Sequence, residues 1–176
     1  MRYVIVSVIK GEAGDFNNNL RREIYEKFKA KSSKLPAHFT IKAPFEYDGN
    51  IKELEKVIED YCISHRRESL EIKGYNHFDD RVIYMDMVMS REGKLLHDGL
   101  IEEMSKIPYI EFTSKDGKDK IFHITISSKR IKSMYYDLWN YVNKYPCKFQ
   151  GYFDNVSIYR WENNTWILHK EYLFQK

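Results

Sequence analysis

The 176-residue sequence is poor in several kinds of residue, and each shortage excludes a class of protein. Two cysteines, Cys62 and Cys147, are too few for a disulfide framework or a cysteine metal cluster. No apolar run approaches the roughly 20 residues that cross a bilayer, and the mean hydropathy is −0.62. The segment Met1–Lys10 is too short and too polar at its end for a signal peptide. We therefore expect a soluble, reduced, cytoplasmic protein with no membrane partner.

An excess of charge of one sign is also missing. Lysine and arginine number 29, aspartate and glutamate number 26, and the net charge of +3 is too weak to identify a nucleic-acid binder. What the chain does have is 43% hydrophobic and 15% aromatic residues, a composition that excludes intrinsic disorder. Its length suits one domain, or two small lobes that share a core.

The apolar spacing predicts an α+β protein with helices and strands interleaved. Asp15, Asn50 and Ser90 are predicted to cap helices. The segment Tyr3–Ile9 is apolar almost throughout, which favours a strand in the middle of a sheet, covered on both faces. Further strands are predicted at 37–47, 69–78, 81–90, 121–128, 148–153, 156–161 and 165–174, with 69–78 and 81–90 forming a hairpin.

The order of the predicted elements repeats. Residues 15–90 give helix, strand, helix and hairpin, and residues 91–174 give helix, strand, helix, a further strand and a hairpin. We interpret this as one bilobal domain over 1–176 with an internal duplication, its approximate halves being 1–90 and 91–176. The alternative is a single mixed sheet without symmetry.

The same short pattern, apolar-His-apolar-Thr-apolar, occurs in one predicted strand of each half: residues 37–41 and residues 122–126. The two histidines are 85 positions apart, close to the period of the duplication. Because side chains alternate across a strand, each strand has one polar face. These faces carry His38, Thr40 and Lys42 in the first strand, and His123, Thr125 and Ser127 in the second.

Two imidazoles and two hydroxyls suit displacement at a phosphorus atom. One imidazole can take a proton from a water or a ribose hydroxyl while the other protonates the departing oxygen. The hydroxyls can donate hydrogen bonds to the non-bridging oxygens that gain charge in the transition state. This chemistry needs no metal or other cofactor.

Basic residues flank both strands. Residues 21–42 carry seven basic side chains against two acidic ones, and residues 115–132 carry six against two. This distribution favours an anionic substrate. Tyr75 and Phe78 are candidates for stacking on a base, with ordinary packing in the sheet as the alternative.

The paired strings, together with Leu35–Phe45 around the first and the C-terminal segment Val156–Trp166, resemble the two-histidine (2H) phosphoesterases, the LigT-like superfamily that includes bacterial 2′-5′ RNA ligases and cyclic phosphodiesterases. The resemblance implies two pseudo-symmetric lobes of antiparallel sheet, with helices outside and a central cleft. It implies that His38 and His123 are the acid and the base, and that Thr40 and Thr125 hold the phosphate. The implied substrate is RNA or a nucleotide with a 2′,3′-cyclic phosphate end, hydrolysed to a 2′-phosphate or joined reversibly in a 2′-5′ linkage.

The sequence lacks both a Gly-x-x-x-x-Gly-Lys loop and the Lys-x-Asp-Gly string of nucleotide-activating ligases, which residues 114–117 only approach. We expect a monomer with no ATP requirement. Lys42 and Ser127 extend the polar faces and are candidates for binding further phosphate charge. Two alternatives stay open at this stage: a catalytically idle RNA-binding module on the same scaffold, and a two-histidine metalloprotein.

Overall fold

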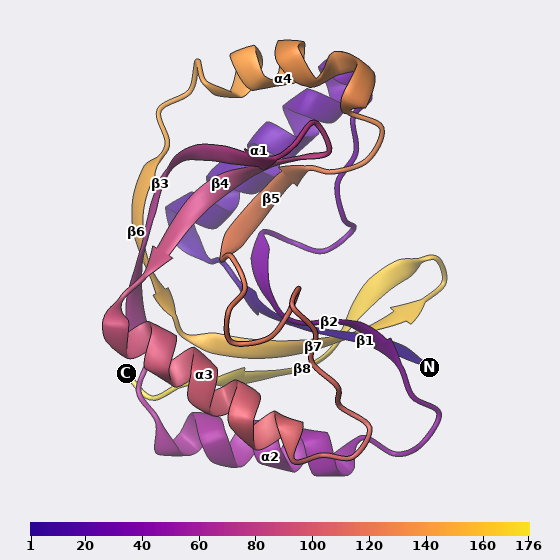
Figure 1. Cartoon of the computed structure of the whole chain (residues 1–176), viewed down its shortest axis with the longest axis vertical. Helices are drawn as coiled ribbons and strands as arrows, with labels where there is room; N and C mark the ends of the chain where they lie inside the picture. Colours follow the sequence, from indigo (N-terminus) through magenta and orange to yellow (C-terminus); the bar gives the residue numbers. More distant parts are fainter.

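The computed structural model describes all residues, 1–176 (Figure 1). The strands are β1 (Arg2–Val8), β2 (His38–Glu46), β3 (Glu68–Phe78), β4 (Val82–Met89), β5 (His123–Ser127), β6 (Lys148–Phe153), β7 (Asn155–Glu162) and β8 (Thr165–Leu173). The helices are α1 (Gly11–Phe28), α2 (Lys52–Ser64), α3 (Arg91–Ser105) and α4 (Tyr135–Val142), with a short 3-10 turn η1 (Lys132–Met134) before α4.

The strands form two four-stranded antiparallel sheets, so the α+β prediction with two sheets is confirmed and the single mixed sheet is wrong. The first sheet has the order β2-β1-β7-β8 and the second the order β5-β4-β3-β6. The chain twice follows the course strand, helix, strand, helix: β1-α1-β2-α2 and β4-α3-β5-α4. In both passages the strand with the histidine lies at the edge of its sheet, beside the strand that began the passage.

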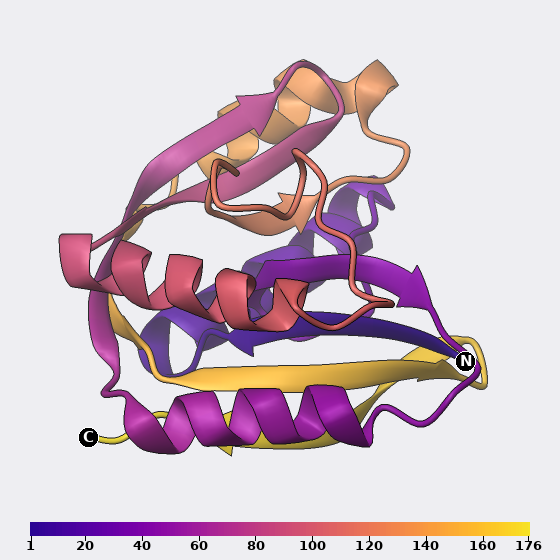
Figure 2. The same ribbon diagram turned by 60° about the horizontal axis from the view of Figure 1, so that its bottom comes forward.

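Helices cover both sheets. Helix α2 packs on β7 and β8 of the first sheet, while α1 packs on β5 and β6 of the second and contacts α4. Helix α3 lies between α2 and the β3–β4 hairpin (Figure 2). Strand β1 is in the middle of its sheet as predicted, and both of its faces are covered. Tyr3 and Ile5 belong to the main core, whereas Val4 and Val6 belong to a small second cluster on the other face.

Two of the predicted caps are informative. Ser90 caps α3 as expected, because its hydroxyl accepts a hydrogen bond of 3.0 Å from the backbone N–H of Gly93. The prediction for Asp15 is wrong, since α1 begins four residues earlier, at Gly11. The chain turns directly from β1 into the helix, and the first turn packs so tightly that a Cβ on Gly14 would lie 2.1 Å from the carbonyl oxygen of Ile9.

Phe39 connects the two sheets through the core. Its side chain is 1% exposed, and its ring meets the ring of Phe122 edge-to-face at 5.7 Å and that of Phe153 at 5.1 Å. Phe39 follows the histidine of β2 and Phe122 precedes the histidine of β5. The aromatic contact therefore lies directly behind the two polar faces.

We expect Phe39→Ala to lower the free energy of unfolding by about 3–5 kcal/mol, because it removes a buried ring and leaves a cavity between the sheets. Urea unfolding monitored by circular dichroism measures this change. Tyr136→Ala, at a ring that is 79% exposed, serves as the control and should stay within about 0.5 kcal/mol of wild type. A loss below about 1 kcal/mol for Phe39→Ala would show that this contact does not hold the sheets together.

Candidate active site

Backbone and side-chain hydrogen bonds hold β2 and β5 close to each other. Lys31, a few residues before β2, forms an antiparallel bridge with Lys129, just after β5. The hydroxyl of Ser127 donates to the carbonyl of Lys31 at 3.2 Å, and the amide of Asn17 on α1 donates to the carbonyl of Thr125 at 3.3 Å. The edges of the two sheets are thus joined at the position of the His-x-Thr strings.

The two histidine rings have the same local arrangement. Nδ1 of His38 lies 2.6 Å from the carbonyl oxygen of Pro36, and Nδ1 of His123 lies 2.9 Å from that of Ile121. A carbonyl oxygen only accepts hydrogen bonds, so Nδ1 carries the proton in both rings. Nε2 of each neutral ring is therefore the nitrogen with a free lone pair, which is the state that a general base requires.

Burial keeps both rings neutral near pH 7. Burial, aided by the charges of Arg21, His123 and Lys120, lowers the pKa of His38 to about 4, although the hydrogen bond to Pro36 acts in the opposite direction. Burial also lowers the pKa of His123, and the charge of Lys120 contributes. A charge on His123 contributes to the lowered pKa of His38, so the two rings lie close enough to interact.

The two threonines lie on the same strand faces as the histidines and are half-buried. Residues of both strands line one narrow cavity of about 10 Å³, namely Thr40 of β2 and His123 of β5. An adjoining cavity of about 520 Å³ opens beside His123. It is lined by Phe78, Arg81, Val82, Ser114, Lys115, Asp119, Lys120, Ile121 and His123.

Phe78 and Tyr84 surround His123 with aromatic rings. The Phe78 ring lies 5.0 Å from the imidazole, edge-to-face, and the Tyr84 ring lies 5.1 Å from it. Tyr84 was not among the site residues predicted from the sequence. The signal that identifies it is its register, because Tyr84 lies directly opposite Thr125 on the neighbouring strand, and opposite residues share a face.

Tyr75 lies on the other face of the second sheet. It pairs with Met85, which in turn pairs with buried Ile124, and its hydroxyl donates to the carbonyl of Tyr145 at 2.9 Å. A bulge at Gly74, where φ is +75°, shifts the register just before Tyr75. Of the two aromatic candidates, the structure thus brings only Phe78 to the histidine.

Lys42 and Ser127 make contacts within the protein. The Lys42 ammonium and the Asp116 carboxylate form a buried ion pair of 2.6 Å, with side chains 7% and 0% exposed. The same carboxylate accepts hydrogen bonds from the N–H of Ala43 and from the N–H and hydroxyl of Thr113. This pair ties the loop of residues 113–120 to β2, while the Ser127 hydroxyl is occupied by the carbonyl of Lys31.

The two basic stretches of the sequence meet in one pocket of about 380 Å³. Its basic side chains are Arg21, Arg22, Lys31, Lys34 and Lys129, and no acidic residue lines it. The guanidinium of Arg21 is fixed by the hydroxyl of Ser32 at 2.7 Å and the carbonyl of Leu35 at 3.0 Å. Its charge contributes to the lowered pKa of His38, so Arg21 links this pocket electrostatically to the first histidine.

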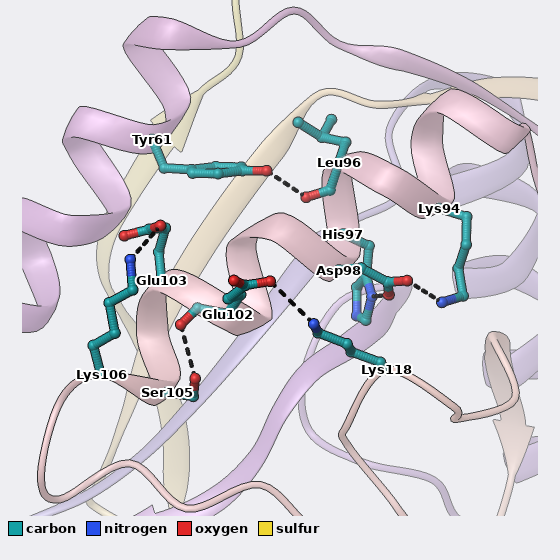
Figure 3. Close-up of polar contacts among 10 residues, drawn as sticks. All are labelled: Tyr61, Lys94, Leu96, His97, Asp98, Glu102, Glu103, Ser105, Lys106 and Lys118. Atoms are coloured by element: carbon teal, nitrogen blue, oxygen red, sulfur yellow. Dashed lines mark hydrogen bonds and ion pairs between the residues drawn. The ribbon is translucent and has the colours of Figure 1, made fainter.

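A larger cavity, about 650 Å³, lies elsewhere, between α2 and α3. Its lining includes Asp60, Glu102 and Glu103, of which the two glutamates are visible in Figure 3 together with Tyr61, whose hydroxyl donates to the carbonyl of Leu96. An acidic lining repels phosphate. This cavity therefore does not suit an anionic substrate.

No group of three or more His, Cys, Asp or Glu side chains is placed to bind a metal ion. His97 is buried beneath the site, edge-to-face with Phe122 at 4.8 Å. None of the helices combines the length and the apolar character that crossing a membrane requires.

Two His-x-Thr strands at adjoining edges of two antiparallel sheets define the 2H phosphoesterase class. A sequence model described as the 2′-5′ RNA ligase superfamily matches residues 13–165, so the chain belongs to that superfamily. Its coarse function is therefore phosphoesterase or ligase chemistry on RNA or nucleotides. A search of curated proteins gives no match.

Solved structures with a similar fold cover almost the whole chain. TT0787 of Thermus thermophilus has a TM-score of 0.68 and 12% sequence identity, over 99% of this chain and 98% of that chain. LigT of E. coli in its apo form has a TM-score of 0.65 and 11% identity, and LigT complexed with NADP+ has a TM-score of 0.63 and 13% identity, both over 99% of this chain and 98% of LigT. At these identities the similarity establishes the LigT-like fold.

The Lys42–Asp116 ion pair yields a stability prediction. We expect Lys42→Met and Asp116→Asn each to lower the free energy of unfolding by about 3 kcal/mol, since each leaves a buried partner without its counterpart. The double variant should lose clearly less than the sum of the two, with a coupling of at least about 0.5 kcal/mol in urea unfolding. Lys56→Met, which removes an exposed i,i+4 pair with Asp60, should lose less than about 0.5 kcal/mol. Additive effects of the two buried substitutions would contradict the ion pair.

Proposed function

We propose that this protein opens 2′,3′-cyclic phosphate ends of RNA or nucleotides to 2′-phosphates by metal-independent, two-histidine acid–base catalysis. One observation carries the proposal: two imidazoles in the same local arrangement, each with Nδ1 on a carbonyl and Nε2 free, lie on strands that also carry a threonine two residues later. This arrangement provides two proton-transfer groups and two hydroxyl donors around one space.

In the proposed reaction, Nε2 of one neutral histidine takes a proton from water as the water oxygen bonds to phosphorus. The bond from phosphorus to O3′ breaks, and the second histidine, protonated, gives its proton to O3′. Thr40 and Thr125 donate hydrogen bonds to the non-bridging oxygens. His38 suits the role of base, because its pKa of about 4 keeps it unprotonated at neutral pH.

His123 then acts as the acid. The negative charge of a bound phosphate raises the pKa of a neighbouring imidazole, which offsets the effect of burial on His123. A 5′-hydroxyl of a second RNA in place of water would give a 2′-5′ linkage by the same proton transfers. Such joining needs no ATP, because the cyclic ester bond that breaks is exchanged for another ester bond.

The basic pocket supports an RNA strand as the substrate. Five cationic side chains without an acidic neighbour beside His38 match the repeated phosphates of a polynucleotide. Tyr25 at the rim is 46% exposed and offers a ring on which a base can stack.

The first test is turnover of 2′,3′-cyclic nucleotides and of RNA with a 2′,3′-cyclic phosphate end, in excess EDTA. We expect wild type to form 2′-phosphate products, and His38→Ala and His123→Ala each to lower kcat by about 10²- to 10⁴-fold because a proton-transfer group is removed. His77→Ala, at an exposed histidine packed against Trp139, is the matched control and should keep wild-type kcat.

Turnover that EDTA abolishes would contradict the metal-free mechanism. Folded wild type that binds RNA but turns over none of these substrates would replace the proposal with the idle RNA-binding module.

The second test concerns the basic pocket. We expect Lys31→Ala with Lys129→Ala to make the salt dependence of RNA binding shallower, by about 0.7 in the slope of log K against log salt for each phosphate that is no longer neutralised. The backbone bridge between these residues needs neither side chain, so the fold should persist. Fluorescence anisotropy with single-stranded RNA at several salt concentrations measures the slope. Lys52→Ala with Lys56→Ala on α2 removes the same charge elsewhere, and an equal change in that control would count against the pocket.

A further inference from the structure

The ammonium of Lys120 has no charged or hydrogen-bonding partner, although it is buried and the rest of the side chain is half-buried. Its ammonium nitrogen is enclosed by protein and makes no hydrogen bond or ion pair. The contacts it does make are with aromatic faces, 5.7 Å from the ring centre of Phe39 and 5.2 Å from that of Phe122. Lys42, the buried lysine of the neighbouring strand, is paired with Asp116, so the two lysines differ sharply in their surroundings.

No acidic group pairs with Lys120: Asp119, its exposed chain neighbour, lines the larger cavity with it and with Lys115 but does not bind its ammonium, and the others are occupied by other partners. Asp116 attracts the Lys120 charge but already binds Lys42, Ala43 and Thr113. On α3, Asp98 is bound by Lys94 and by Nδ1 of His97, and Glu102 is bound by Lys118 of the same loop (Figure 3). The other titratable groups that sense Lys120 are His38, His97, His123 and Lys94, and none of them carries a negative charge that could pair with its ammonium.

Lys120 also faces the site. It lines both the narrow cavity that it shares with Thr40 and His123 and the larger cavity beside His123. An unpaired ammonium is costly to bury, so such a group loses its proton or gains an anion. Burial lowers the pKa of Lys120 to about 7, and an anion in the adjoining cavity would supply the missing partner.

We infer that Lys120 is a further catalytic residue, which binds the phosphate held between His38 and His123 and becomes fully charged when that anion arrives. The inference rests on the proposed function. According to this inference, the ligand of Lys120 is a phosphate oxygen. Lys120 takes up a proton when the anion binds.

The proton uptake gives a signature. In the free protein, Lys120 loses its charge as the pH rises above its pKa of about 7. Affinity for an anion whose own charge is constant should therefore fall at higher pH, approaching about tenfold per pH unit. In the free protein the neighbouring histidines have lowered pKa values, while Lys94 is paired with Asp98 and Asp116 with Lys42.

The experiment uses inorganic sulfate as the probe, because sulfate does not titrate near or above neutral pH. Calorimetric titration from about pH 6.5 to about pH 9 should give a dissociation constant that rises with pH for wild type. Lys120→Arg, with a permanent charge, should bind sulfate with a clearly smaller rise, which comes only from the proton that His123 takes up, and Lys120→Met should bind it at least about tenfold more weakly at the acidic end of the range. In parallel, kcat/KM for a cyclic nucleotide should fall about 10²-fold in Lys120→Met, a loss typical of removing one stabilising donor.

Stability and a matched control complete the test. Lys120→Met should be at least as stable as wild type in urea, since it removes an unpaired buried charge. Lys118→Met, in the same loop but exposed and bound to Glu102, should retain the wild-type pH dependence. Wild-type turnover together with unchanged kcat/KM and sulfate binding in Lys120→Met would overturn the role of Lys120 and leave the proposed function intact. If wild type turns over no substrate but its sulfate binding depends on Lys120, the proposed function is overturned and anion binding by Lys120 stands.

Discussion

The contact between Phe39 and Phe122 across the two sheets is the constraint on which the site depends. Each ring is a chain neighbour of one of the two His-x-Thr histidines, and side chains alternate across a strand. The buried Phe39 and the half-buried Phe122 packed against it therefore turn the two imidazoles outward, onto the other face. No further interaction is needed to orient the histidines, because hydrophobic packing on one face of a strand determines which side chains lie on the other face.

The contacts around this pair share one property: they join segments that are distant in the chain. Lys42 meets Asp116, Lys31 meets Lys129, and Asn17 meets Thr125. All of them connect β2, or the segments that precede it, with β5 or the segments on either side of β5. The region where the two sheets meet therefore contains the two neutral imidazoles, the unpaired ammonium of Lys120 and the pocket of five cationic side chains.

The sequence was sufficient to predict the strands, the α+β class and the two His-x-Thr strings, since these follow from local periodicity. It was insufficient wherever a long-range contact decides. Nothing near Lys42 indicates that its charge is bound by a carboxylate 74 residues away. Tyr75 and Phe78 looked equivalent as aromatic residues of one strand, but they are three positions apart and lie on opposite faces. Lys120 was one basic residue among six in its stretch, and only its burial without a partner distinguishes it.

The distribution of the strands of each half between the two sheets has a consequence for how the protein folds. Each sheet takes two strands from the first half of the chain and two from the second: β1 and β2 with β7 and β8, and β3 and β4 with β5 and β6. A fragment that ended between β4 and α3 would hold two separate strand pairs, each with an open edge and an uncovered apolar face. Neither half can complete a sheet, so the two histidines belong to one cooperative structure although they lie in repeated strings. A protein divided at this point would be expected to regain its fold only when both fragments associate.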